Sequence, residues 1–159
     1  MTIKCPVCGT RYCSEHFDRW WNRKKFDWNN SSFLAQCCPN HFDKWWDEDK
    51  YNWNSGSWSL ARFCFNYFNI WWNPNKFNWK DGSWALARYC VKYFDMWWDA
   101  DKYNWERDSN YLAHYCAEYF DIWWDLNRFN IKHLDTLELF CSEHKDKWIE
   151  LKLYQDLST

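Results

Sequence analysis

Apolar residues recur at steps of three and four along the middle of the chain. Between Ser57 and Trp72 the stripe consists of Ala61, Cys64, Phe65, Phe68, Trp71 and Trp72, and it is widened by Leu60, Tyr67 and Ile70. This spacing predicts one α-helix of about 16 residues, roughly 24 Å long. Because the helix is apolar over so much of its circumference, it needs cover on more than one side.

The same pattern returns along the whole chain as an internal repeat. Its most regular marker is a cysteine every 25 or 26 residues: Cys13, Cys38, Cys64, Cys90, Cys116 and Cys141. A His or Tyr follows each cysteine by three residues, and the first five units continue with Phe and a Trp pair at 20/21, 45/46, 71/72, 97/98 and 123/124. Upstream lie Leu-Ala and a serine that we interpret as the helix N-cap: Ser32, Ser57, Ser83 or Ser109.

A shorter element is predicted after each Trp pair. Asn73-Pro74, like the Asp at the same position in other units, indicates the start of one turn of α or 3₁₀ helix. Residues 79–83 are then expected to form a turn back to the next helix. One long helix and one short turn per repeat predict an all-α fold, an α-solenoid-like array of about six units. We expect a zinc-binding N-terminal cap at 1–16 that merges into the first repeat, Trp-rich repeats at 13–140 and a capping helix at 141–159.

Composition narrows the classes of function. Of 159 residues, 17 are Trp, 12 Phe and 10 Tyr, whereas Gly and Pro number three each, which excludes disorder and collagen. The net charge of −2 gives no overall field for phosphate or an anionic membrane, so nucleic acid is not the expected partner. Nine cysteines without a secretory leader indicate reduced thiols and a cytoplasmic, intracellular protein. The longest uncharged stretch is broken by Asn and Pro, so no membrane span is expected.

One candidate site is a metal centre at the N-terminus. Cys5 and Cys8 are separated by Pro-Val, and Cys13 and His16 follow within one helical turn of each other. Thiolate and imidazole at this spacing are typical of a closed, structural Zn²⁺ site with four protein ligands. The alternative ligand pair is Cys38 and His41 in the second repeat. The last repeat contains the same Cys-Ser-Glu-His tetrapeptide without a neighbouring Cys pair, so Cys13 and His16 could also serve only as ordinary repeat positions.

The repeated aromatic and basic residues have two interpretations each. Trp at a fixed helical position is what packing between repeats requires, but indole rings also stack on bases or sugars. The basic residues form a row if the units stack in register, although each is expected to pair with the Asp or Asn three residues before it: Lys25, Lys50, Lys76, Lys102 and Arg128. The cysteine column is interpreted as small buried residues.

The sequence contains no catalytic motif, so we do not expect an enzyme. The leading expectation is an interaction scaffold for a partner macromolecule, most simply a protein, with structural zinc. The alternative is a nucleotide- or glycan-binding protein that uses exposed Trp rings and the basic row. The position before the Trp pair changes from Arg19 and Lys44 to Ile70, Met96 and Ile122. Units three to five are therefore more apolar on one further side. Either the array curls so that this side is covered internally, or it forms a patch for a partner or for self-association, which is the expectation we favour.

Overall fold

The fold is helical throughout the part of the chain that the structure describes. The computed structural model describes residues 3–158, with side chains to residue 153, and this part holds eleven α-helices, seven 3₁₀ helices and no β-strand. An isolated antiparallel bridge joins Lys4 to Arg11. The chain divides into two compact units, Met1–Asn78 and Trp79–Thr159, and neighbouring helices pack together within each unit. The division into cap, repeats and capping helix stays a prediction.

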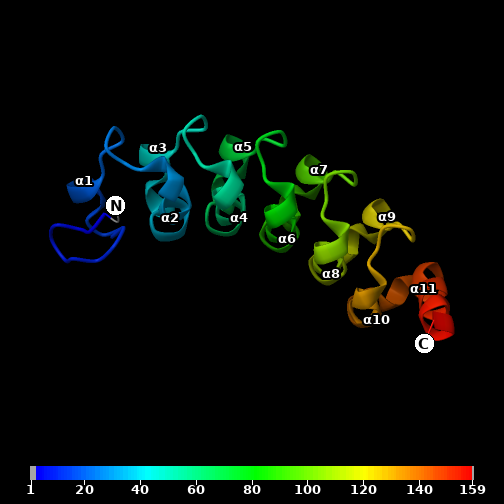
Figure 1. The fold of residues 1–159 in the computed structure, drawn as a ribbon. Coiled ribbons are helices and arrows are strands. Elements are labelled where there is room, and N and C mark those ends of the chain that lie inside the picture. Colours follow the sequence, from blue (N-terminus) through cyan, green and yellow to red (C-terminus); the bar gives the residue numbers. More distant parts are fainter. Residues whose placement is uncertain (1–2, 159) are drawn as a thin grey trace. The chain divides into compact units, whose positions relative to one another are not determined.

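The first unit alternates long and short helices (Figure 1). Its α-helices are α1 (Phe17–Trp20), α2 (Ser31–Cys37), α3 (Phe42–Trp45), α4 (Trp53–Phe63) and α5 (Phe68–Trp71). Its 3₁₀ helices are η1 (Trp28–Asn30), η2 (Pro39–His41) and η3 (Phe65–Tyr67). The longer helices α2 and α4 lie side by side.

The second unit repeats this alternation. Its α-helices are α6 (Trp79–Tyr89), α7 (Phe94–Trp97), α8 (Trp105–Tyr115), α9 (Phe120–Trp123), α10 (Leu134–Phe140) and α11 (Lys145–Ser158). Its 3₁₀ helices are η4 (Val91–Tyr93), η5 (Ala117–Tyr119), η6 (Ile131–His133) and η7 (Ser142–His144). The helix α8 packs against α6 on one side and α10 on the other.

The single long helix predicted over each Cys position is wrong, because the backbone leaves the α-helix at the cysteine. Helix α4 ends at Phe63, and Cys64 has φ −115° and ψ 24°. Its carbonyl accepts the N–H of Tyr67 at 2.9 Å and the indole Nε1–H of Trp71 at 2.8 Å. The indole therefore stabilises the break by satisfying a carbonyl that a continuous helix would have used internally.

The predicted serine caps are also wrong, since each helix starts earlier than the serine. Helix α4 begins at Trp53, and the side chain of Asn52 caps it by accepting the N–H of Ser55 at 3.3 Å. Ser57 lies inside the helix, where its hydroxyl donates to the Trp53 carbonyl at 2.6 Å and accepts the N–H of Asn78 at 2.9 Å. These serines link one repeat to the next.

Two further segments differ from the predicted boundaries. Residues 79–83, predicted as a turn, belong to the first part of α6. The segment after the Trp pair is a turn and not a helix: the N–H groups of Lys76 and Phe77 donate to the Asn73 carbonyl at 3.2 and 3.0 Å. The Asn73 side chain also accepts the N–H of Asn75 at 3.0 Å. Side-chain acceptance of this kind closes a compact turn without extending it into a helix.

The core is built from the repeated apolar positions. The first Trp of each pair is buried together with the repeat Cys, the Phe between them and the Leu-Ala pair, as the packing interpretation predicted. Each of these Trp residues donates its Nε1–H to the carbonyl of the Cys seven residues earlier, at 2.7–2.9 Å. Burial therefore leaves no indole N–H unsatisfied in this column.

Candidate metal centre

The four predicted ligands come together at the start of the chain. A tight loop positions the first two: Gly9 N–H donates to the Cys5 carbonyl at 2.9 Å, and Cys5 N–H donates to the Thr10 carbonyl at 2.9 Å. Gly9 has φ +71°, in the left-handed region that glycine adopts without strain. Val7 N–H points at the Cys5 sulfur at 3.4 Å, as backbone amides around a thiolate ligand do.

The second pair of ligands precedes α1. Cys13 Sγ lies 3.4 Å from His16 Nδ1, and the ligand atoms of Cys5, Cys8, Cys13 and His16 all lie within 4.8 Å of one another. Cys5 and Cys13 are buried, His16 is half-buried and Cys8 is exposed. Three sulfurs and one imidazole nitrogen this close could hold a metal ion.

The thiols of this group differ electrostatically from those of the core. Hydrogen bonds from Thr10, first from its side chain and then from its backbone, and from His16 lower the pKa of Cys8 to about 6. In contrast, burial raises the pKa of Cys38 and of Cys141 to about 12 and raises that of Cys64 further still. The thiolate, which is the metal-binding form, is therefore favoured at Cys8 and disfavoured in the core. Although a backbone hydrogen bond at His16 lowers it, the pKa of Cys13 is raised overall, because burial and the neighbouring thiols of Cys8 and Cys5 outweigh that bond.

The alternative ligands Cys38 and His41 have other partners in the structure. Cys38 is fully buried and its sulfur donates to the Tyr12 carbonyl at 3.4 Å. His41 Nε2 donates to the Ser14 carbonyl at 2.9 Å, and its ring stacks on Phe17 at 4.5 Å. Both residues hold the segment that carries Cys13 and His16, so they support the candidate centre from the second repeat.

The first described repeat differs from later ones in the partner of its His. In later repeats the His or Tyr ring stacks on the Phe of the repeat before: Tyr67 on Phe42 at 4.4 Å and Tyr119 on Phe94 at 4.3 Å. No Phe precedes His16 among residues 3–15, and its ring nitrogen lies beside the Cys13 sulfur instead. An alignment of the repeats therefore distinguishes this candidate ligand from the packing residues at the same position.

The copy of the tetrapeptide in the last repeat follows the packing pattern. Cys141 Sγ donates to the Ala113 carbonyl at 3.5 Å, and His144 stacks on Phe120 at 4.3 Å with the rings nearly parallel. The same four residue types thus serve packing at one end and form a candidate metal group at the other.

Four of the five residues of the basic row form ion pairs, and three of them do so with the Asp three residues earlier, as predicted: Lys50, Lys102 and Arg128. Within the described residues Lys25 forms no ion pair. Lys50 and Lys102 lie 3.4 and 3.3 Å from the Asp three residues earlier. Lys76 pairs with Asp49 at 2.9 Å, and Arg128 pairs with Asp101 at 2.8 Å, each in the preceding repeat. A row of cations already matched by carboxylates attracts little phosphate.

The second Trp of each pair sits at the border of the core. Trp46 stacks on Phe42 at 5.1 Å, tilts against Tyr51 at 5.4 Å and meets Trp53 edge-on at 5.7 Å. The ring is half-buried. One side of each indole is therefore committed to packing and the other faces outward.

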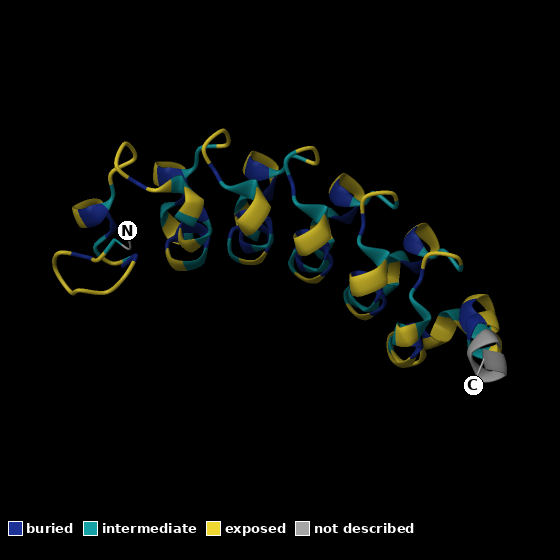
Figure 2. Ribbon diagram, in the orientation of Figure 1, coloured by how far each residue is buried: buried dark blue, intermediate teal, exposed yellow. Residues whose placement is uncertain are grey.

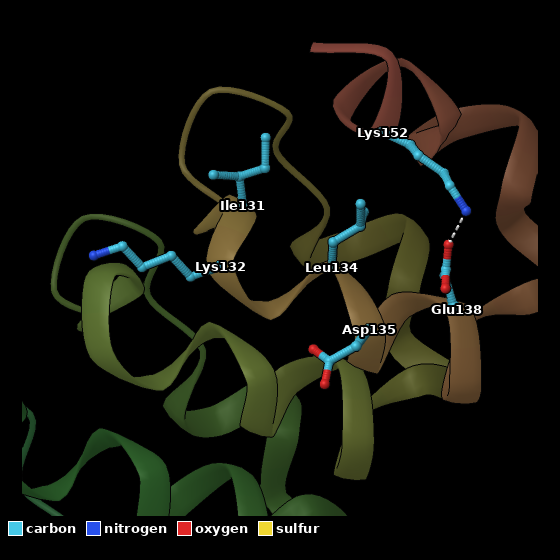
Figure 3. A pocket seen from close by; sticks show the side chains of 6 residues that line it. All are labelled: Ile131, Lys132, Leu134, Asp135, Glu138 and Lys152. Atoms are coloured by element: carbon cyan, nitrogen blue, oxygen red, sulfur yellow. Dashed lines mark hydrogen bonds and ion pairs between the residues drawn. The ribbon is translucent and has the colours of Figure 1, made fainter. Parts of the chain in front are cut away.

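The second unit also holds two shallow cavities. One of about 280 Å³ is lined by Ile131, Lys132, Leu134, Asp135, Glu138 and Lys152, and an ion pair between the last two spans one side (Figure 3). The other, of about 320 Å³, is lined by Trp84, Arg107, Asp108, Asn110, Tyr111 and His133.

Sequence reasoning missed the buried carboxylate of the second cavity. Asp108 is 1% exposed and accepts hydrogen bonds from Ser83 Oγ at 2.6 Å and from Arg107 Nε at 2.7 Å. It occupies the position of Gly56 and Gly82 in the preceding repeats. The change from glycine to aspartate at this repeat position was the feature of the sequence that could have indicated this carboxylate.

Comparisons with known proteins do not assign the chain to a family. The chain matches no protein family, and neither the curated proteins nor the solved structures show significant similarity to it. Within the described residues, none of the helices has both the length and the apolar character needed to cross a bilayer.

Proposed function

We propose that the protein is a non-enzymatic α-solenoid that serves as a scaffold for a protein partner and is closed at its N-terminus by a structural zinc ion. The observation that carries this proposal is the recurrence of equivalent contacts in both units. The repeats share a buried Trp that donates to the Cys carbonyl, and later repeats add a ring stack on the Phe of the repeat before, so that stability comes from neighbours. Such arrays present their outward side chains to partners.

Zinc is the metal that the donor set favours. Three thiols and one imidazole are a common tetrahedral set for structural Zn²⁺, and soft sulfur ligands disfavour Mg²⁺ and Ca²⁺. Four protein ligands leave no open position for a substrate. We infer that the ion stabilises the first repeat by fixing Cys13 and His16.

The state of the thiols and imidazoles supports a role other than catalysis. Burial holds the column thiols in the protonated form, which is a poor nucleophile. His41 and His144 are stacked on Phe17 and Phe120, so both imidazoles contribute to packing. The reactive thiol, Cys8, belongs to the candidate metal group.

Two measurements test this proposal. Elemental analysis of protein purified without added metal should find about one zinc per chain. Deletion of one whole repeat, residues 90–115, should leave a protein that still unfolds cooperatively with lower stability, since each repeat contacts only its neighbours. A deletion protein with no cooperative transition would contradict the solenoid.

The 320 Å³ cavity favours a second candidate, a small-ligand binding protein. Its walls combine the rings of Trp84 and Tyr111, 5.7 Å apart, with the Arg107 guanidinium. The buried Oδ1 of Asn110 accepts no hydrogen bond from the described residues. Aromatic walls with a few polar groups are typical of sites for small ligands such as a glycan or nucleotide. Titration with neutral oligosaccharides and with nucleotides, compared with a Tyr111→Ala variant, tests this candidate.

A further inference from the structure

The residue before the first Trp of the pair makes an ion pair in the second and last repeats. Lys44 Nζ lies 2.7 Å from Asp18 Oδ1, and Lys147 pairs in the same way with Asp121. All four side chains are largely exposed. In both cases the lysine meets the aspartate of the preceding repeat, so in these two repeats the position closes a charge pair across the surface.

The three intervening positions lose the lysine, and two of the three facing positions keep the aspartate, whereas the residue that would face Met96 is Asn69. Ile122 takes the position of the lysine that would pair with Asp95, and Ile70 takes the one that would pair with Asp43. Both isoleucines are 58% exposed, and Met96 at the same position is 54% exposed. Asp43 and Asp95 form no ion pair with any residue between positions 3 and 153.

In the second unit the segment that leads into α9 carries a further carboxylate. Phe94 of α7 stacks on Tyr119, which directly precedes α9, so the two short helices are neighbours. Glu118, the residue before Tyr119, is exposed and, within the described residues, forms no ion pair. Burial and then the charges of Glu118 and Asp95 raise the pKa of Tyr119, so both carboxylates lie near this ring. Figure 2 shows that α7 and α9 each bury one face and expose the other. From here on the exposed group Asp95, Met96, Glu118 and Ile122 is called the acidic-apolar surface.

We infer that the acidic-apolar surface binds a cationic amphipathic segment of a protein partner, an inference that rests on the proposed scaffold function. The partner would supply the Lys or Arg that the chain omits at position 122, together with apolar side chains for Met96 and Ile122. Charge favours this occupant, because residues 79–159 contain fifteen Asp and Glu against ten Lys and Arg. A helix with apolar residues on one stripe and basic residues beside it has this chemistry.

Selection from a random peptide library on the purified, metal-loaded protein tests the inference without assuming a partner. Peptides of about 16 residues allow roughly four helical turns. We expect the selected peptides to carry Lys or Arg beside apolar residues at helical spacing. Ile122→Lys should weaken their binding at least about tenfold, since it removes a central apolar contact and lets Asp95 form the pair seen at Lys147. Because that pair already exists at an equivalent position, the variant should fold with unchanged stability.

The matched control is Leu139→Lys on α10. Leu139 is 71% exposed, so this change removes an equally exposed apolar residue and adds the same charge away from the surface. If Ile122→Lys and Leu139→Lys weakened peptide binding equally, or if the selected peptides were acidic, the assignment of this surface would be overturned. Either result would still be consistent with a protein-binding scaffold. A library that yields no specific binder would contradict the scaffold function as well. Light scattering on the protein alone completes the test: a dimer that dissociates on Ile122→Lys would make a second copy the occupant.

Discussion

Replacement of the buried Trp97 tests whether the tryptophan column holds the repeats together. The side chain is 1% exposed and meets Phe94 edge-on at 5.0 Å. It also stacks against Tyr103 at 6.4 Å, and its Nε1–H donates to the Cys90 carbonyl at 2.9 Å. Two variants separate these roles: Trp97→Ala removes the ring and the hydrogen bond, whereas Trp97→Phe keeps an aromatic ring but not the donor.

The two variants should lower the free energy of unfolding by different amounts. Trp97→Ala should lower the free energy of unfolding by about 3–5 kcal/mol, the range for deleting a buried large aromatic side chain. In Trp97→Phe the Cys90 carbonyl still accepts the Tyr93 N–H at 2.9 Å, so the lost hydrogen bond costs only about 0.5–1.5 kcal/mol. When the packing lost with the smaller Phe ring is included, Trp97→Phe should lower the free energy of unfolding by about 1–3 kcal/mol in total. Lys102→Ala, which loses an exposed pair with Asp99, should cost less than about 1 kcal/mol.

Urea unfolding followed by far-ultraviolet circular dichroism is the suitable assay, because its signal does not depend on the tryptophan removed. The order expected for the destabilisation is Trp97→Ala, then Trp97→Phe, then Lys102→Ala. If Trp97→Ala cost no more than Lys102→Ala, the indole would not be a packing residue, and the reasoning that assigns the column to the core would fail.

Further changes test other parts of the structure. Cys5→Ser should release about one zinc per chain, measured by elemental analysis, and lower the melting temperature of the first repeat more than that of the others. Stability should fall as pH rises from about 9 towards 12, because unfolded thiols ionise near pH 9 whereas burial raises the pKa of folded Cys38 and Cys141 to about 12. Urea midpoints at pH 7 and pH 10.5 measure this loss, and Cys141→Ala should reduce it. Gly56→Ala should cost about 1–3 kcal/mol by thermal melt, because a Cβ there would lie 2.6 Å from the Tyr51 hydroxyl.

The sequence pattern predicted the helical class and the buried face but not where each helix ends. Period and hydrophobicity identify the positions of Trp71 and Cys64, and both are buried. The break at Cys64 depends on an indole seven residues later, a tertiary hydrogen bond that local preference does not contain. The same limit applies to Ser57: a serine before an apolar run resembles a cap, but its real partner is Asn78, 21 residues away.

The metal group was predictable because its ligands are close in sequence. Cys5 to His16 span one short segment, so spacing alone indicated the chemistry, and the structure places the four ligand atoms within 4.8 Å of one another. The unpaired Asp95 was not predictable in this way. Its isolation appears only when the pairs Lys44–Asp18 and Lys147–Asp121 are seen across repeats.

The first and last described repeats hold their Cys and His with different contacts. In a helical array uncovered apolar positions promote association, so the buried positions of every repeat need a partner. At the C-terminus, α11 supplies ordinary side chains: Trp148 is 2% exposed and its indole donates to the Cys141 carbonyl at 2.8 Å, while Lys147 faces outward to Asp121. Near the N-terminus, the loop before α1 instead brings the ligand atoms of Cys5, Cys8, Cys13 and His16 within 4.8 Å of one another. A metal ion bound by this group would fix Cys13 and His16, whereas in the last repeat Cys141 is held by a hydrogen bond to the Ala113 carbonyl and His144 by its stack on Phe120.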